Sequence, residues 1–360
     1  MLLLHAALDP ADAAVDAWRT WEAKGGWRAV HEDPFALRML PTIYRRLVDH
    51  SSAVEILQPY YEEARAANLH LFARCAALVR MLQQEKIPVI VLKGTALSLL
   101  YYQDIGARPM SDFDVMVSRN CVERSMQILR TAGLQPRVPL VADASAELLT
   151  VHHAWPMRKD DENAPWEFDL HWRLLADYPN ATVDAELQRC AQTLHVYGVE
   201  TRALCATDML FHVCVHGFAW APMPSMRWIA DAMTILRCAG ERIDWGRMIT
   251  IAADSRAGLP LQQALAFLVD RFGAPIDQRV LKQLLEIPTT ASHRAMHRAL
   301  TQRSEILGRL PVHIHRRRAS FPEMSFAEYI AAYYGLEGSA AVMRWGLGKA
   351  AARMAALLRR

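Results

Sequence analysis

Three short apolar runs flanked by polar residues predict a small sheet in the middle of the chain. They lie at residues 88–92, 112–117 and 166–171. In the second and third runs acidic and apolar side chains alternate, and a period of two is typical of a strand with one buried face. A helix is predicted at about 120–132, where Gly133 ends it. One further strand is expected around 149–157, within a stretch of loops.

Helical periodicity dominates on both sides of these strands. Residues 11–80 repeat apolar positions at intervals of three and four residues. From Thr207 onward, breaks at proline and glycine separate a series of predicted helices. They are 207–218, 225–239, 244–257, 260–271, 277–286 and 290–305. The run Arg316-Arg317-Arg318 is interpreted as a solvated stretch of charge.

The last stretch, from Ser339 to Arg360, has the pattern of a basic amphipathic helix. Such a helix most often packs on its own domain. The alternative is contact with a partner or with an anionic membrane surface.

Together these elements predict an α+β protein, with a small mixed sheet between helical regions. We expect four regions along the chain. They are a helical N-terminal region at 1–84, an α/β core at 85–200, a helical domain at 201–310 and a C-terminal helical extension at 311–360.

Composition and charge restrict the class of protein. The formal net charge of +3 is too small to indicate a nucleic-acid substrate. No apolar run approaches the roughly 18 to 20 residues of a membrane span, and the first residues lack the basic region of a signal peptide. The six cysteines are scattered without a Cys-x-x-Cys spacing, which indicates reduced thiols in a cytoplasmic protein.

The most informative stretch runs from Lys93 to Asp114. The apolar run before it leads directly into Lys93-Gly94-Thr95, which predicts a strand followed by a short helix. Gly94 permits a phosphate to approach the backbone closely, and the helix N-terminus favours anions. Lys93 and Arg108 are available to neutralise phosphate charge.

Acidic residues on the second strand predict a metal site. Asp112 and Asp114 are two residues apart on a strand, so both point to one face. Neighbouring carboxylates repel unless a cation lies between them, and Mg²⁺ prefers carboxylate and phosphate oxygens. On the third strand, Asp169 and His171 share the polar face of Trp166–Trp172. If the two strands pair, three carboxylates can hold two metal ions, with Asp169 as the base that activates an acceptor hydroxyl.

These motifs resemble a known bacterial family, the uncharacterised nucleotidyltransferases of the DNA polymerase β-like superfamily. The resemblance rests on the Lys-Gly turn, the Asp-x-Asp strand and the third aspartate, and extends over roughly residues 10–300. Its motifs are Leu92-Lys93-Gly94, Tyr101 to Arg108, Ser111 to Asp114, His152-His153, Phe168 to Trp172, Asp208 to His212 with His216, Arg227 to Asp231, Ile243 to Trp245, and Asn68. The wider superfamily usually carries Gly-Ser at the turn where this chain has Lys93-Gly94-Thr95.

The resemblance implies a polymerase β-like sheet and Mg²⁺-dependent transfer of a nucleoside monophosphate, such as AMP from ATP, with release of pyrophosphate. It implies metal ligands at Asp112, Asp114 and Asp169, and phosphate binding by the Lys-Gly turn and Arg108. The acceptor is expected to be a small molecule, a sugar or a peptide. His171, His216 and Asp231 are candidates for its pocket.

Two other functions stay open from the sequence. His212 and His216 are four residues apart on one predicted helix face, a spacing that can bind zinc. With His152, His153 and His171 they suggest a zinc-dependent hydrolase, although no glutamate stands between the helical pair. The other alternative is a non-catalytic partner-binding protein that keeps the fold and docks through its C-terminal helix.

Overall fold

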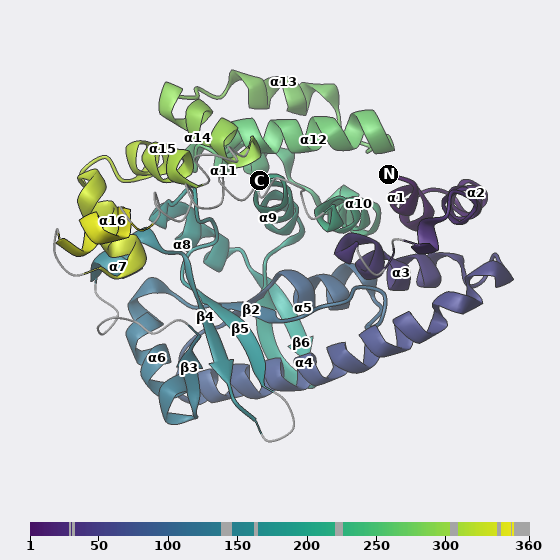
Figure 1. Cartoon of the computed structure of the whole chain (residues 1–360), viewed down its shortest axis with the longest axis horizontal. Coiled ribbons are helices and arrows are strands. Elements are labelled where there is room, and N and C mark those ends of the chain that lie inside the picture. Colours follow the sequence, from purple (N-terminus) through teal and green to yellow (C-terminus); the bar gives the residue numbers. More distant parts are fainter. Residues whose placement is uncertain are drawn as a thin grey trace.

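A mixed sheet lies at the centre of the molecule (Figure 1). The computed structural model describes residues 1–28, 30, 33–137, 146–161, 165–219, 226–302, 309–336, 340–346 and 348. Within these residues, seven strands are hydrogen-bonded in the order β3-β4-β5-β2-β1-β7-β6. The strands are β1 (Ile90–Leu92), β2 (Phe113–Met116), β3 (Leu134–Pro136), β4 (Ala154–Lys159), β5 (Trp166–His171), β6 (Gln192–Val196) and β7 (Val199–Ala203).

The sheet combines both strand directions. β2 is antiparallel to β1 but parallel to β5, and β1 is also parallel to β7. The outer pairs β3–β4, β4–β5 and β6–β7 are antiparallel. This arrangement confirms the predicted α+β class with a mixed sheet.

Helices lie on both sides of this sheet (Figure 1). Before the first strand, the chain forms α1 (Leu2–Leu8), α2 (Ala11–Ala23), α3 (Pro34–Leu47) and α4 (Gln58–Gln84), with the 3-10 turns η1 (Gly26–Arg28) and η2 (Ser52–Leu57). Between the strands are α5 (Lys93–Leu97), the π-helical turn η3 (Ser98–Tyr102), the 3-10 turn η4 (Arg119–Cys121), α6 (Val122–Thr131), α7 (Ala146–Val151) and α8 (Ala181–Arg189).

The C-terminal half is helical. It contains α9 (Ala206–Ala219), α10 (Arg227–Ala239), η5 (Gly240–Arg242), α11 (Trp245–Asp254), α12 (Gly258–Phe272), α13 (Gln278–Glu286), α14 (Ala291–Thr301), α15 (Leu310–Ser320) and α16 (Phe326–Tyr334). The six α-helices from α9 to α14 follow the six predicted ranges closely. Residues 340–346 are also helical, whereas most of the predicted basic helix at 339–360 lies outside the described residues.

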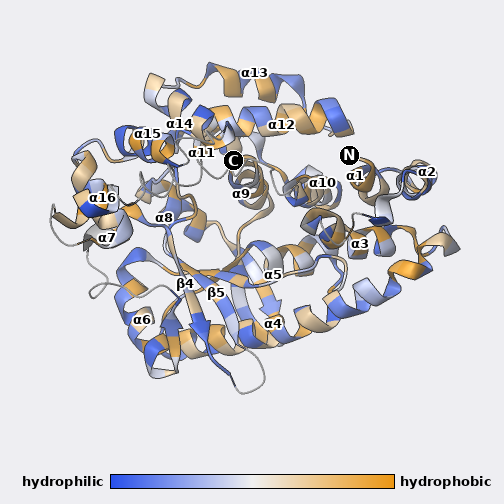
Figure 2. Cartoon of the chain, viewed as in Figure 1, coloured by the Kyte–Doolittle hydropathy of each residue, from blue (hydrophilic) through white to orange (hydrophobic). Residues whose placement is uncertain are grey.

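The long helix α4 shows why the chain folds in this way. Its buried residues recur at alternating intervals of four and three, at Ala64, Asn68, Leu71, Cys75, Leu78 and Leu82. This spacing places them on one side of a helix. Figure 2 shows hydrophobic and hydrophilic residues alternating along α4 and α12, as expected for helices with one buried side. In Figure 1, α4 runs along one side of the sheet, and α9 and α12 lie on the other.

Asn68 is the polar exception in the apolar stripe of α4, and it holds a loop. Its side-chain amide donates to the carbonyl oxygens of Ile105 at 2.5 Å and Arg108 at 2.8 Å. Its Oδ1 accepts from the backbone N–H of Met110 at 3.2 Å. The loop between η3 and β2 is therefore fixed by one buried side chain of α4.

Several segments differ from the sequence prediction. The strand expected around 149–157 begins only at Ala154, because residues 149–151 close the helix α7. The hairpin β6–β7 was not predicted, although Tyr197 and Gly198 form its two-residue turn with positive φ angles of 46° and 73°. Such a turn matches the twist of a hairpin.

Arg316 also differs from its prediction, since this part of the arginine run is buried rather than solvated. It lies on α15, and its guanidinium donates to the carbonyl oxygens of Val151 and Ala176 and pairs with Asp177 at 3.4 Å. The carbonyl partners are 165 and 140 residues away along the chain. Local charge patterning therefore gave no sign of them.

The state of the cysteines and the lengths of the helices can be compared with the sequence prediction. All six cysteines are free thiols. Among the described residues, no helix is both long and apolar enough to cross a membrane. The four predicted regions stay a prediction.

We predict that Asn68→Ala destabilises the protein and loosens the loop at 105–110. The substitution leaves buried backbone groups without partners, which costs about 2 to 4 kcal/mol in the free energy of unfolding. Thermal unfolding and amide hydrogen exchange within this loop measure the two effects. Gln84→Ala, at an exposed position on the same helix, is the control, and equal behaviour of the two variants contradicts the prediction.

Candidate active site

Two carboxylates lie side by side on one face of the sheet. Asp114 of β2 and Asp169 of β5 are paired in register on adjacent parallel strands. Residues in register on adjacent strands point to the same face. Asp114 is only 6% exposed, and Asp169 is half-buried. The structure therefore brings together two of the three predicted carboxylates, from segments more than fifty residues apart along the chain.

Asp114 has two nitrogen partners at one oxygen. The Lys93 ammonium lies 2.6 Å from Asp114 Oδ1, and His171 Nε2 lies 3.0 Å from the same oxygen. Only a protonated Nε2 can donate to a carboxylate, so this nitrogen carries the proton. The other ring nitrogen, Nδ1, is buried without a hydrogen-bond partner. His171, expected in the acceptor pocket, thus lies within the carboxylate cluster.

The surroundings give the three carboxylates different proton affinities. Burial opposes the charge of Asp114, but Lys93 and the hydrogen bond from His171 outweigh it and hold the pKa well below its usual range. For Asp169, burial and then the charge of Asp114 raise the pKa. Asp112 is exposed as a residue, but neighbouring atoms partly desolvate its carboxylate, and this effect, followed by the charge of Asp114, raises its pKa as well. Asp114 is therefore fixed as an anion, and Asp169 is the better proton acceptor.

The cluster has the donor set of a divalent cation site. One ligand atom each of Asp114, Asp169 and His171 lies within 4.8 Å of the others. Two carboxylates and an imidazole are suitable ligands for a divalent metal. Asp112 is not part of this group; it is exposed and lies one residue before β2.

The histidines that suggested zinc do not form a site of their own. Within the described ranges, Asp114, Asp169 and His171 make up the group of potential ligands found within such a distance. His212 and His216 stack on α9, with ring centroids 5.3 Å apart. Burial lowers the pKa of His216 to about 3, so this imidazole is neutral at physiological pH and a weak base.

More imidazoles surround the carboxylates. His153 packs edge-to-face on His171 at 5.2 Å between centroids. His212 is 1% exposed, and among the described residues neither of its ring nitrogens has a hydrogen-bond partner. Burial lowers the pKa values of both His153 and His212. Neutral imidazoles therefore line the site next to the carboxylates.

The turn before α5 holds its lysine in an unusual conformation. Lys93 has a φ angle of 41°, in the left-handed region that costs a side-chain-bearing residue energy. The helix continues through Gly94 and Thr95, both of which are buried, and the Thr95 hydroxyl lacks a partner. A Cβ atom at Gly94 would lie 2.4 Å from Met110 Sδ and 2.9 Å from Arg108 Nη1, so a larger residue here would require these two side chains to move.

Arg108 and Asp231 form a buried ion pair. Arg108 Nε and Nη2 donate to the two oxygens of Asp231, each at 2.8 Å. The Tyr102 hydroxyl donates to Asp231 Oδ1 at 2.9 Å. The residue expected to bind phosphate and one expected in the acceptor pocket are thus bonded to each other. Tyr102 is not among the site residues predicted from the sequence. The one signal that could have indicated this contact surface of α10 is the four-residue separation of Arg227 and Asp231, which places both on one face of a helix.

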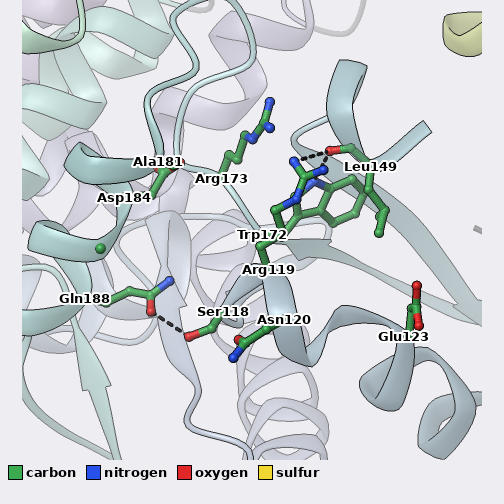
Figure 3. Close-up of a pocket in the computed structure, with 11 residues that line it drawn as sticks. Ser118, Arg119, Asn120, Glu123, Leu149, Trp172, Arg173, Ala181, Asp184 and Gln188 are labelled. Carbon is green, nitrogen blue, oxygen red and sulfur yellow. Dashed lines mark hydrogen bonds between the residues drawn. The ribbon is translucent and has the colours of Figure 1, made fainter. Parts of the chain in front are cut away.

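A separate cavity opens beyond the ends of β2 and β5 (Figure 3). It has a volume of about 630 Å³, and it is lined by Ser118, Arg119, Asn120, Glu123, Leu149, Trp172, Arg173, Ala181, Asp184, Ala185 and Gln188. Figure 3 shows the guanidinium of Arg119 bonded to the Leu149 carbonyl, and Ser118 bonded to Gln188. None of the predicted site residues lines this cavity, although Trp172 directly follows His171.

A model of the family described as "Uncharacterised nucleotidyltransferase" matches residues 27–273, which span the chain from before α3 to the end of α12. No curated protein matches the chain significantly. Among solved structures, the chain is similar to one titled "Crystal structure of an antigenic nucleotidyltransferase-like protein from Paracoccidioides brasiliensis". The identity is 16%, the TM-score is 0.39, and the match covers 62% of this chain and 94% of that chain. A likeness this low does not establish a shared fold.

We predict that Lys93→Met lowers stability in a pH-dependent way. In the wild type, the lowered pKa of Asp114 stabilises the fold above the ordinary carboxyl range near pH ~4, and this contribution is lost as the pH falls further. Without the ammonium, burial favours the neutral acid. We expect the variant to lose about 3 kcal/mol near pH 7, and the difference to narrow as Asp114 becomes protonated.

Denaturant unfolding between pH 3 and 8 measures this difference, with a chelator present so that no cation replaces the ammonium. Lys282→Met, at an exposed position of α13, is the control. A loss for Lys93→Met that is independent of pH contradicts the prediction.

Proposed function

The chain belongs to the uncharacterised nucleotidyltransferase family, and from its site we propose transfer of a nucleoside monophosphate, AMP from ATP, to an acceptor hydroxyl. The acceptor is a small molecule, a sugar or a peptide, and pyrophosphate is released. The observation that carries the proposal is the pairing of Asp114 with Asp169 across parallel strands, beside the Lys93-Gly94 turn. A hydrolase using zinc finds less support, because the histidines of α9 stand outside the group of potential metal ligands.

The proposed metal is Mg²⁺, as two ions held by Asp112, Asp114 and Asp169. The carboxylate oxygens fit this cation, and His171 supports the charged form of Asp114. When bound, the cation supplies charge neutralisation of the phosphates and lowers the pKa of the acceptor hydroxyl.

In the proposed reaction, the acceptor oxygen forms a bond to the α-phosphorus as the bond to the pyrophosphate oxygen breaks. Asp169 takes the proton of the acceptor hydroxyl, for which its raised pKa suits it. Lys93, which is bonded to Asp114, and Arg108, whose Nη1 lies near Gly94, are proposed to neutralise the leaving pyrophosphate. Gly94 is proposed to leave room for the phosphates at the turn.

We predict that Asp114→Asn and Asp169→Asn abolish nucleotide transfer. Loss of a metal ligand or of the general base costs roughly 10²- to 10⁴-fold in rate. The purified protein is incubated with each α-labelled nucleoside triphosphate, Mg²⁺ and a cell extract as the source of acceptor. Transfer of label and release of pyrophosphate are measured.

Asp160→Asn, at an exposed position after β4, makes the same chemical change on the same sheet and should keep full activity. Asp112→Asn tests the exposed carboxylate with little risk to folding. Unchanged transfer in the Asp114 and Asp169 variants refutes these roles. A wild-type protein that neither transfers label nor binds any nucleotide refutes the proposed function and favours a non-catalytic role.

A further inference from the structure

Helix α10 contacts the loop at 105–110 at two points, and an arginine takes part in each contact. Arg227 and Asp231 are four residues apart, so they lie on one face of the helix. Asp231 binds the guanidinium of Arg108 through both oxygens. Arg227 Nη1 donates to the carbonyl oxygen of Pro109, the residue that follows Arg108, at 3.0 Å. The two guanidinium groups are thus bound at neighbouring points of the contact between α10 and this loop.

The charge of this group is not balanced. Both oxygens of Asp231 are engaged, by Arg108 and by the Tyr102 hydroxyl. Within the part of the chain that the structure describes, Arg227 pairs with no carboxylate. The proximity of Arg108, and then burial, lower the pKa of Arg227 to about 10. Two adjacent guanidinium ions repel each other, and an anion bound between them removes this cost.

The two arginines also face the candidate active site. The Nη1 of Arg108, which Asp231 does not use, makes no hydrogen bond in the described structure and lies next to Gly94. The charge of Arg227 acts on Asp112 and opposes the rise of its pKa. Arg227 is therefore close enough to Asp112, the carboxylate before β2, for the two charges to interact.

We propose that Arg227, together with the Nη1 edge of Arg108, binds the polyphosphate of the donor nucleotide. The inference rests on the proposed function and adds to it a phosphate-binding residue from the helical half of the chain. The guanidinium fork matches two phosphate oxygens at once, and the loop and α10 hold it in place before the donor arrives. The ligand is therefore a chain of at least two phosphates, as in a nucleoside triphosphate or in pyrophosphate.

The test uses inorganic tripolyphosphate as a probe, titrated calorimetrically into the full-length protein with Mg²⁺ present. We expect the wild type to bind and Arg227→Met to bind about ten- to a hundredfold more weakly. Arg227→Lys restores the charge without the fork and should recover part of the affinity. Arg237→Met, at an exposed position near the end of the same helix, is the matched control and should bind like the wild type.

Equal affinity of Arg227→Met and Arg237→Met for tripolyphosphate overturns the inference, and so does a wild type that does not bind the probe. Thermal unfolding of each variant identifies any loss of folded protein, and the calorimetric affinity is that of the folded fraction. Label transfer from a nucleoside triphosphate is measured separately. If the wild type transfers label and Arg227→Met binds tripolyphosphate as tightly as the wild type, the proposed function stands and the inference about Arg227 is overturned. Arg227-dependent binding without any transfer refutes the proposed function alone.

Discussion

The carboxylate of Asp114 lies almost entirely inside the protein, directly beside a second carboxylate. Removing such a charge from water costs several kcal/mol unless cationic and hydrogen-bonding groups surround it. Lys93 and His171 provide these groups, at 2.6 Å and 3.0 Å. The lysine reaches this position with its own backbone in the left-handed region. Neutralising Asp114 therefore fixes the relative positions of the turn before α5, strand β2 and strand β5.

A second buried charge pair extends this constraint to the helices. Asn68 of α4 donates to the backbone carbonyl of Arg108 in the loop at 105–110, and the guanidinium of the same Arg108 binds Asp231 of α10. The loop beside the Lys-Gly turn is thus tied to helices on both sides of the sheet. The family match, over residues 27–273, includes both of the helices that hold this loop, α4 and α10. The candidate site needs helices before and after the sheet to keep its geometry.

The sequence was informative where chemistry and periodicity coincide within a few residues. Acidic side chains alternating with apolar ones predicted β2 and β5, and the partnership of Asp114 with Asp169 followed once the strands paired. The partners of buried cations were beyond reach, because they come from distant segments. Arg108 is 123 residues from Asp231 along the chain. No local sequence pattern distinguishes an arginine that forms a buried ion pair from one that is available to bind phosphate. The β6–β7 hairpin was within reach, since its turn and its alternation are both visible in the sequence.

The groups around Asp114 differ in charge. Lys93 is an ammonium and Arg108 and Arg227 are guanidinium groups, while His153, His212 and His216 have lowered pKa values and stay neutral at physiological pH. Imidazoles with such low pKa values are weak bases, so in the proposed reaction Asp169, whose pKa is raised, is the better candidate for proton removal. Burial of these histidines thus confines the positive charge of the site to Lys93 and the two arginines, which are the groups proposed to bind the phosphates.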